Sequence, residues 1–138
     1  MNGIKLNVLC ELNAPILTHP NELVQVFLNI IKNANDAHTK AKKENPYIKI
    51  KGYETKEEQI IEISDNAGGI DEKIICNIFD PYFTTKDEKN GTGLGLYISK
   101  IIIETHCNGK LQVKNIYESG ELTGVKFIIS FLKNKPII

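Results

Sequence analysis

Apolar and polar residues alternate at the start of the chain, and the period changes to a helical one after residue 20. Five apolar side chains occupy every second position from residue 4 onward: Ile4, Leu6, Val8, Cys10 and Leu12. A period of two places them on one face and predicts a strand with that face buried. We expect a second short strand around 14–17 and a helix start at 18–20, where a threonine and a histidine precede a proline.

The segment from 21 to about 43 has the pattern of a long helix. Two apolar series recur there at spacings of three and four: Leu23, Phe27, Ile30 and Ala34, and beside them Val24, Leu28 and Ile31. Together they form a wide apolar wedge, which predicts a helix that is buried on most sides. The sequence Glu-Asn-Pro at 44–46 ends this helix.

The rest of the chain predicts four strands and two further helices. Strands are expected at 47–55, 59–65, 110–117 and 124–132, a short helix at 71–79, and a second long helix at 94–106. Tight turns join neighbouring strands, so the sheet should be mostly antiparallel, with the helices on one face. We therefore predict one domain over 1–138 with the fold class α/β (α+β), a two-layer sandwich with a mixed sheet.

Polar residues form a stripe on the first long helix. Asn29, Asn33 and Asp36 are spaced four and three apart, so they share one side of the helix. Asparagine is a mediocre helix former and is costly to bury without partners. The stripe faces either a polar cavity or bulk water, and taken alone it slightly favours bulk water.

A carboxylate lies at the end of the strand at 59–65. Asp65 falls on the same face as Ile61 and Ile63, and glycines follow it at 68 and 69. A buried carboxylate needs a hydrogen-bond donor, and glycines let a ligand approach the backbone. The exocyclic amine of a purine would suit, and capping of the following turn is an equal alternative.

The sequence GTGLGL at 91–96 precedes the second long helix. Glycines before a helix start allow close approach of phosphate oxygens to backbone N–H groups. The spacing differs from the dinucleotide fingerprint and from the P-loop, so this motif alone is weak evidence.

Composition narrows the class of protein. The chain has 138 residues with 17 basic and 17 acidic side chains, and this balance speaks against a nucleic-acid partner. Three distant cysteines, Cys10, Cys76 and Cys107, favour packing or surface thiols over disulfides or zinc. No apolar stretch approaches membrane-spanning length, and the start lacks the pattern of a signal peptide. We expect a cytoplasmic protein, whose parent can be membrane-anchored through other segments.

Four segments in this order resemble one known family. NELVQVFLNIIKNANDA, ISDNAGGI, IFDPYFTTK and GTGLGLYISK are similar to the N-box, first glycine box, F-box and second glycine box of the catalytic, ATP-binding domain of bacterial sensor histidine kinases. The boxes span 21–100, and the flanking strands fit the rest of that fold. The resemblance implies the Bergerat ATP-binding fold, the cofactors ATP and Mg²⁺, and a lid at about 70–93 over the nucleotide.

The resemblance also implies roles for individual residues. Asn33 matches the amide that coordinates Mg²⁺, and Asn29 matches the second catalytic asparagine, near the phosphates and the metal. Asp65 matches the acceptor for the adenine amine, with Gly69 in the pocket wall. The nucleotide-binding residues implied are Asn29, Asn33, Asp36, Asp65, Ala67, Gly69, Ile70, Phe79, Phe83, Thr84, Thr85, Lys86, Gly91, Thr92, Gly93, Leu94, Gly95 and Leu96. Lys32 and Lys100 could also reach phosphate, although only Lys86 lies within a motif.

Two positions depart from the family pattern. Ala67 stands at a usual glycine, which is tolerable if its φ is negative. Gly124 is followed by Val125 where the family often has a threonine that assists adenine recognition. That contact is either lost or supplied by Thr123 in a shifted register, so the affinity for ATP could be modest.

The implied reaction needs a partner. In the family, the γ-phosphoryl group of ATP passes to a histidine on a separate dimerisation domain, and then to a response regulator receiver domain. His19, His38 and His106 lack the His-Glu/Asp-x-x-x-Pro context of that acceptor, and we read them as surface or capping residues. We expect a monomer that binds ATP and does not phosphorylate itself.

Other members of the superfamily are less favoured. The ATP-hydrolysing branches carry a glutamate as general base where this chain has Asn29, and an amide cannot abstract a proton. A nucleotide-binding module without kinase activity and a serine kinase of the anti-sigma type stay open as alternatives.

Overall fold

One five-stranded sheet runs through the part of the chain that the computed structural model describes, residues 3–83 and 94–133. Its order is β1-β2-β3-β5-β4, and only β1 and β2 are parallel. The strands are β1 (Lys5–Cys10), β2 (Tyr47–Glu54), β3 (Glu58–Asp65), β4 (Lys110–Glu118) and β5 (Glu121–Leu132). The mostly antiparallel mixed sheet predicted from the sequence is confirmed.

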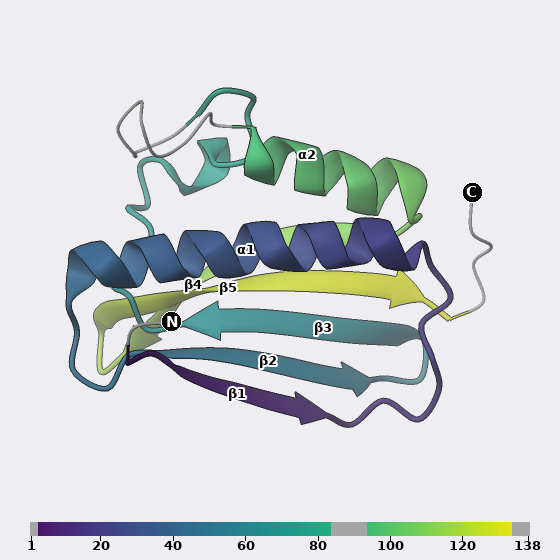
Figure 1. Cartoon of the computed structure of the whole chain (residues 1–138), viewed down its shortest axis with the longest axis horizontal. Helices are drawn as coiled ribbons and strands as arrows, with labels where there is room; N and C mark the ends of the chain where they lie inside the picture. Colours follow the sequence, from purple (N-terminus) through teal and green to yellow (C-terminus); the bar gives the residue numbers. More distant parts are fainter. Residues whose placement is uncertain (1–2, 84–93, 134–138) are drawn as a thin grey trace.

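The helices lie together on one face of this sheet, as Figure 1 shows. Helix α1 (Pro20–Ala41) begins with proline at its first turn and ends at Lys42, which has a left-handed conformation. It connects β1 to β2, and such a long crossover is what allows these two strands to run parallel. None of the helices in residues 3–83 and 94–133 is long and apolar enough to cross a membrane.

The second long helix changes its hydrogen-bond pattern partway. Helix α2 (Gly95–Ile101) is followed by the π-helical turn η2 (Ile102–His106), in which the N–H of Cys107 donates to the carbonyl of Ile102 at 2.9 Å. Asn108, with a φ of 57°, then turns the chain into β4.

The core lies between the sheet and the two helices. Its most deeply buried large side chains are Ile30 of α1, Ile48 of β2, Ile63 of β3, Ile103 of η2, Leu111 of β4 and Ile129 of β5. Burying one such side chain contributes about 1.5–3 kcal/mol. Because every layer contributes, the core fixes α1 and α2 over β3 and β5.

The prediction that α1 is buried on most sides is wrong. Val24 is 52% exposed and Leu28 is 62% exposed. Helix α2 packs against the opposite flank of α1, and β1 lies at the open edge of the sheet. One flank of α1 therefore keeps apolar side chains in contact with solvent. The prediction that one face of β1 is buried is also wrong, because Leu6 is 47% exposed and Val8 is 66% exposed.

Two predicted elements are absent or shorter. Residues 14–17 form no strand, and the carbonyls of Ala14 and Pro15 accept hydrogen bonds from the Gln59 side chain at 3.0 and 3.4 Å instead. The predicted helix at 71–79 is reduced to the 3₁₀ turn η1 (Ile75–Asn77). The carbonyl of Asp71 accepts from two successive N–H groups there, which closes a turn rather than a helix.

Candidate functional site

Asp65 is buried at the end of β3. The N–H of Ala67 donates to its Oδ1 at 3.0 Å, so the turn-capping role is present. Burial raises the pKa of the Asp65 carboxyl above its usual value, while the N–H groups of Ala67 and Val125 and the nearby His38 act against this rise. Two N–H donors do not exhaust the lone pairs of a carboxylate, so the cap leaves Asp65 able to accept another hydrogen bond.

Two positions near Asp65 require glycine for steric reasons. A Cβ at Gly124 would lie 1.9 Å from the backbone oxygen of Asp65, and one at Gly69 would lie 2.5 Å from Cδ1 of Leu122. Gly69 also has a φ of 75°. Ala67 is not among the residues with positive φ, which meets the condition under which its methyl group is tolerated.

The residue paired with Asp65 has no hydroxyl group, although the family pattern often has a threonine there. Val125 is paired directly with Asp65 in the sheet and is buried. The hydroxyl of Thr123 donates to the carbonyl of Ile116 at 3.2 Å, on the side of β4. The Thr123 hydroxyl therefore does not supply the contact that a threonine would make at the position of Val125.

A clamp that the sequence reasoning missed holds the turn after β3. Asn115 of β4 accepts a hydrogen bond from the N–H of Ile70 at 2.8 Å and donates to the carbonyl of the same residue. Asn115 also donates to Glu72, and Tyr117 donates to the same Glu72 oxygen at 2.5 Å; these bonds lower the pKa of Glu72. The sequence could have indicated Asn115, because it is a polar residue on the same strand face as the apolar Leu111.

The amide stripe of α1 faces the start of α2. Asn29 Nδ2 lies 3.3 Å from the carbonyl of Gly95 and 3.1 Å from Oγ of Ser99. Asn33 and Asp36 are half-buried on the same side, one and two turns further along. Asn29 thus does not simply face bulk water.

The stripe also offers the oxygen atoms that Mg²⁺ requires. Among residues 3–83 and 94–133, no three His, Cys, Asp or Glu side chains are grouped as a metal site. Amide oxygens suit a hard cation that keeps several of its waters. The side chains of Asn29 and Asn33 therefore fit Mg²⁺ by their chemistry.

The F-box aromatics pack against the core. The ring of Phe79 stacks edge-on against Phe127, with 6.3 Å between centroids, and Phe83 packs against the same cluster. Lys100 lies 4.7 Å above the Phe79 ring and bonds to Glu104 and to the carbonyl of Leu111. These contacts tie Lys100 to the scaffold, so it is a weaker candidate for phosphate than the sequence suggested.

Eight of the twelve described site residues form two groups, one near the C-terminal half of α1 and one near its middle. The arrowhead of β3 lies beneath the C-terminal half of α1 in Figure 1, and α2 begins over its middle. The group near the C-terminal half of α1 consists of Asp65, Ala67, Gly69 and Ile70. The group near its middle consists of Asn29, Leu94, Gly95 and Leu96. Asn29 and Asp36 are about 10 Å apart along the helix axis at 1.5 Å per residue. The predicted residues Thr84, Thr85, Lys86, Gly91, Thr92 and Gly93 lie outside the described part of the chain.

The prediction that all three histidines are surface or capping residues is wrong for one of them. His38 is not a surface residue: it is 5% exposed, and its Nε2 lies 2.9 Å from the carbonyl of Tyr47, where α1 crosses the start of β2. His106 is exposed and pairs with Glu22 at 3.0 Å. His19 precedes α1 and makes no side-chain capping bond.

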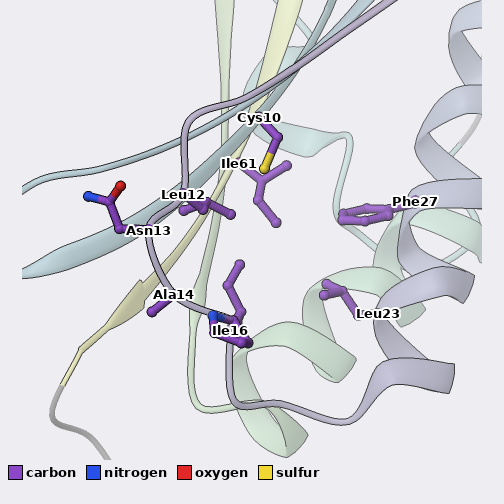
Figure 2. Close-up of a pocket in the computed structure, with 9 residues that line it drawn as sticks. Cys10, Leu12, Asn13, Ala14, Ile16, Leu23, Phe27 and Ile61 are labelled. Atoms are coloured by element: carbon purple, nitrogen blue, oxygen red, sulfur yellow. The ribbon is translucent and has the colours of Figure 1, made fainter.

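A separate apolar hollow of about 470 Å³ lies near the other end of α1. Figure 2 shows Leu23 and Phe27 of α1 on one side of it and Cys10, Leu12 and Ile61 on the other. No residue predicted to bind the nucleotide lines it.

Solved structures place the fold in a known class. The catalytic domain of the histidine kinase ThkA superposes with a TM-score of 0.75 and 30% identity, over 95% of this chain and 80% of that one. A full-length structure of ShkA in complex with AMPPNP gives a TM-score of 0.72 at 21% identity, over 93% of this chain and 25% of that one, and shows the fold alone. The fold is that of a histidine kinase catalytic domain, as the sequence predicted.

Sequence comparison identifies the family. Residues 18–135 match the model for histidine kinase-, DNA gyrase B-, and HSP90-like ATPases, so the chain belongs to that family. Similar curated proteins are the sensor protein KdpD of Clostridium acetobutylicum (39% identical, over 71% of this chain and 11% of that protein) and sporulation kinase E of Bacillus subtilis (37%, over 84% and 14%). The kinase AtoS of Escherichia coli is 40% identical over 75% of this chain and 16% of its own length. The chain thus spans less than a fifth of these relatives.

Proposed function

We propose that this chain is the ATP- and Mg²⁺-binding catalytic domain of a sensor histidine kinase, which transfers the γ-phosphoryl group of ATP to a histidine on a separate dimerisation domain. The observation that carries the proposal is the buried Asp65 carboxylate, beside Gly69 and Gly124, on the side of the sheet covered by α1, whose Asn29 amide reaches Gly95. The names of the relatives support the kinase activity, which we propose for this chain by similarity.

Asp65 is proposed to select the base. Its carboxylate accepts a hydrogen bond from the adenine amine, while Ala67, Gly69 and Ile70 form the adjoining wall. A guanine would present a carbonyl oxygen at this place, and two acceptors repel each other. Asp65 therefore favours ATP over GTP.

The phosphate end is proposed to use α1 and the lid. Asn33 holds Mg²⁺ through its side-chain oxygen, and Asn29 and Asp36 lie beside it. When bound, Mg²⁺ neutralises charge on the phosphates. The segment 70–93, with Thr84, Thr85, Lys86, Gly91, Thr92 and Gly93, is proposed to close over the nucleotide, anchored by Phe79 and Phe83, with Leu94, Gly95 and Leu96 at its hinge.

Catalysis by this domain would consist of positioning and charge stabilisation, because the nucleophile comes from elsewhere. His38 is held against Tyr47 beneath α1 and cannot serve as a phosphoacceptor without unfolding of that contact. The chain alone should bind ATP as a monomer without phosphorylating itself. We propose that the phosphoryl group passes from the dimerisation domain of the parent kinase to a response regulator in the cytoplasm.

The test is phosphotransfer in trans. The chain is mixed with [γ-³²P]ATP, Mg²⁺ and purified dimerisation domains of related sensor kinases, and acid-labile label on the acceptor histidine is measured. We expect label with the wild type and, at an ATP concentration near its Kd, much less label with Asp65→Asn. Failure with several such domains, despite normal ATP binding, would contradict the kinase function.

One observation favours a second function, that of a nucleotide-binding module without kinase activity. Val125 leaves Asp65 without a hydroxyl neighbour, and Thr123 is bonded to the opposite strand. If calorimetry shows ATP binding while the parent protein's own histidine is never phosphorylated, this second function is the correct one.

A further inference from the structure

Ser99 lies at the contact between α1 and α2, and nothing in its sequence motif assigns it a role. It is fully buried, and it follows Gly95 by one helical turn. Its Oγ donates to the carbonyl of Gly95 at 2.8 Å and lies 3.1 Å from Nδ2 of Asn29. Asn29 Nδ2 reaches the same carbonyl at 3.3 Å.

Hydrogen-bond chemistry fixes the orientation of the Asn29 amide. The carbonyl of Gly95 can only accept, so it requires the nitrogen end of the amide. The Ser99 proton is already given to that carbonyl, so Ser99 offers Asn29 only its lone pairs, and these also require the nitrogen. Both partners therefore exclude the flipped amide, in which oxygen would face oxygen.

The oxygen end of the Asn29 side chain remains available. With its nitrogen held against α2, Asn29 is left with its oxygen as the group that a ligand can use. An oxygen suits a cation or a water bound to that cation, whereas the nitrogen would suit a phosphate oxygen.

We propose that Ser99 is a positioning residue of the nucleotide site: oriented by the Gly95 carbonyl, its hydroxyl locks the Asn29 amide so that the amide oxygen faces the Mg²⁺ side of the bound nucleotide. This role rests on the proposed function, because it acts on a site that the nucleotide must occupy. A purely structural serine, bonded back to the preceding turn of its own helix, would have no effect on Asn29.

The hydrogen bond can be measured without any nucleotide. In the ¹⁵N-labelled chain, the side-chain NH₂ signals of Asn29 are identified by their loss in Asn29→Ala. Ser99→Ala should shift these signals and accelerate their exchange with water, because one of two acceptors is removed. The matched control is Ser130→Ala, which removes another buried serine hydroxyl from β5 and should leave the Asn29 signals unchanged.

Binding separates the positioning role from a structural one. Affinity for a non-hydrolysable ATP analogue is measured by calorimetry with Mg²⁺ and with a chelator. Ser99→Ala should weaken binding about fivefold with Mg²⁺, the equivalent of one hydrogen bond, and change it little without metal. In the Asn29→Ala background, Ser99→Ala should have no further effect, because its action passes through Asn29.

The outcomes distinguish the two proposals. A wild-type chain that binds no nucleotide overturns the proposed function and, with it, this role. Wild-type binding with Ser99→Ala equal to Ser130→Ala, or an equal loss with and without metal, overturns the role of Ser99 alone. Thermal unfolding of the variants shows that they are folded, so that weaker binding reports on the site.

Discussion

The two ends of the proposed site are built in different ways. At the base end, Asp65 is placed by strand register, and the turn that follows it rests on β5 through backbone contacts that only glycine permits. At the phosphate end, Asn29 is placed by side-chain hydrogen bonds between two helices. Strand geometry tolerates little change, whereas side-chain bonds can be altered one at a time. Variants that disturb strand packing at the base end should therefore cost more than variants at the phosphate end.

The largest effect is expected at Gly124. An alanine there would place its Cβ 1.9 Å from the Asp65 oxygen, so β5 must separate from β3. We expect Gly124→Ala to lose about 3 kcal/mol of unfolding free energy or more in urea denaturation, together with nucleotide binding. Gly120→Ala is the control, since its Cβ meets nothing within 4 Å and only the positive φ of 80° is strained. That variant should lose only about 1 kcal/mol; equal losses would refute the steric account.

Asp65→Asn should come next, with an effect on binding rather than on stability. The change removes a buried charge and its acceptor for the adenine amine while keeping the shape of the side chain. We expect affinity for ATP to fall about ten- to hundredfold, the range for a hydrogen bond to a charged group. Stability at neutral pH should be equal or higher. The exposed Glu57→Gln, in the turn at the other end of β3, is the control and should change neither quantity.

Lowering the pH should weaken nucleotide binding for a related reason, and by less than Asp65→Asn does. Burial raises the pKa of Asp65, so the folded state takes up this proton at higher pH than the unfolded chain does. Protonation thus favours folding, and that contribution is lost as the pH rises through the raised pKa. Adenosine binding requires the carboxylate and should fall as the pH drops through the same range. The control is the same titration with His38→Gln, which removes the imidazole near Asp65. An adenosine affinity that does not change with pH in the wild type would contradict the role of Asp65.

The Asn115 clamp tests whether the wall of the base pocket must be held. Asn115→Ala removes both bonds to Ile70 and the bond to Glu72. We expect about a three- to tenfold loss of ATP affinity and faster hydrogen exchange of the Ile70 amide, because Ile70 loses both of its hydrogen bonds to Asn115. Faster exchange without any loss of affinity would show that the clamp serves folding alone.

The smallest effect is expected at position 125. Val125→Thr restores a hydroxyl on the residue paired with Asp65. We expect ATP to bind up to about fivefold more tightly, with a small loss of stability if the hydroxyl lacks a partner in the free protein. An unchanged affinity would mean that this position does not contact the base in this chain.

The sequence allowed prediction of the sheet, the long helices and the buried carboxylate, because each depends on a period that the chain repeats. Asp65 was found as a polar residue on an apolar strand face, and the same argument applied to β4 would have found Asn115. The exposed flank of α1 could not be foreseen, because exposure depends on where α2 lies and on β1 being an edge strand. His38 and Ser99 were missed for the same reason: their partners, Tyr47 and Asn29, are distant in sequence and are brought close only by packing.

The most direct measurement is an NMR titration of the ¹⁵N-labelled chain with a Mg²⁺-bound, non-hydrolysable ATP analogue, with the GTP analogue as the comparison. One nucleotide that spans both ends of the site should shift the backbone signals of 65–70 together with the side-chain signals of Asn29 and Asn33, at a common affinity. The GTP analogue should shift neither group at the same concentration. Shifts confined to one group, or equal responses to both nucleotides, would contradict the account that Asp65 and the amides of α1 form a single adenine nucleotide site.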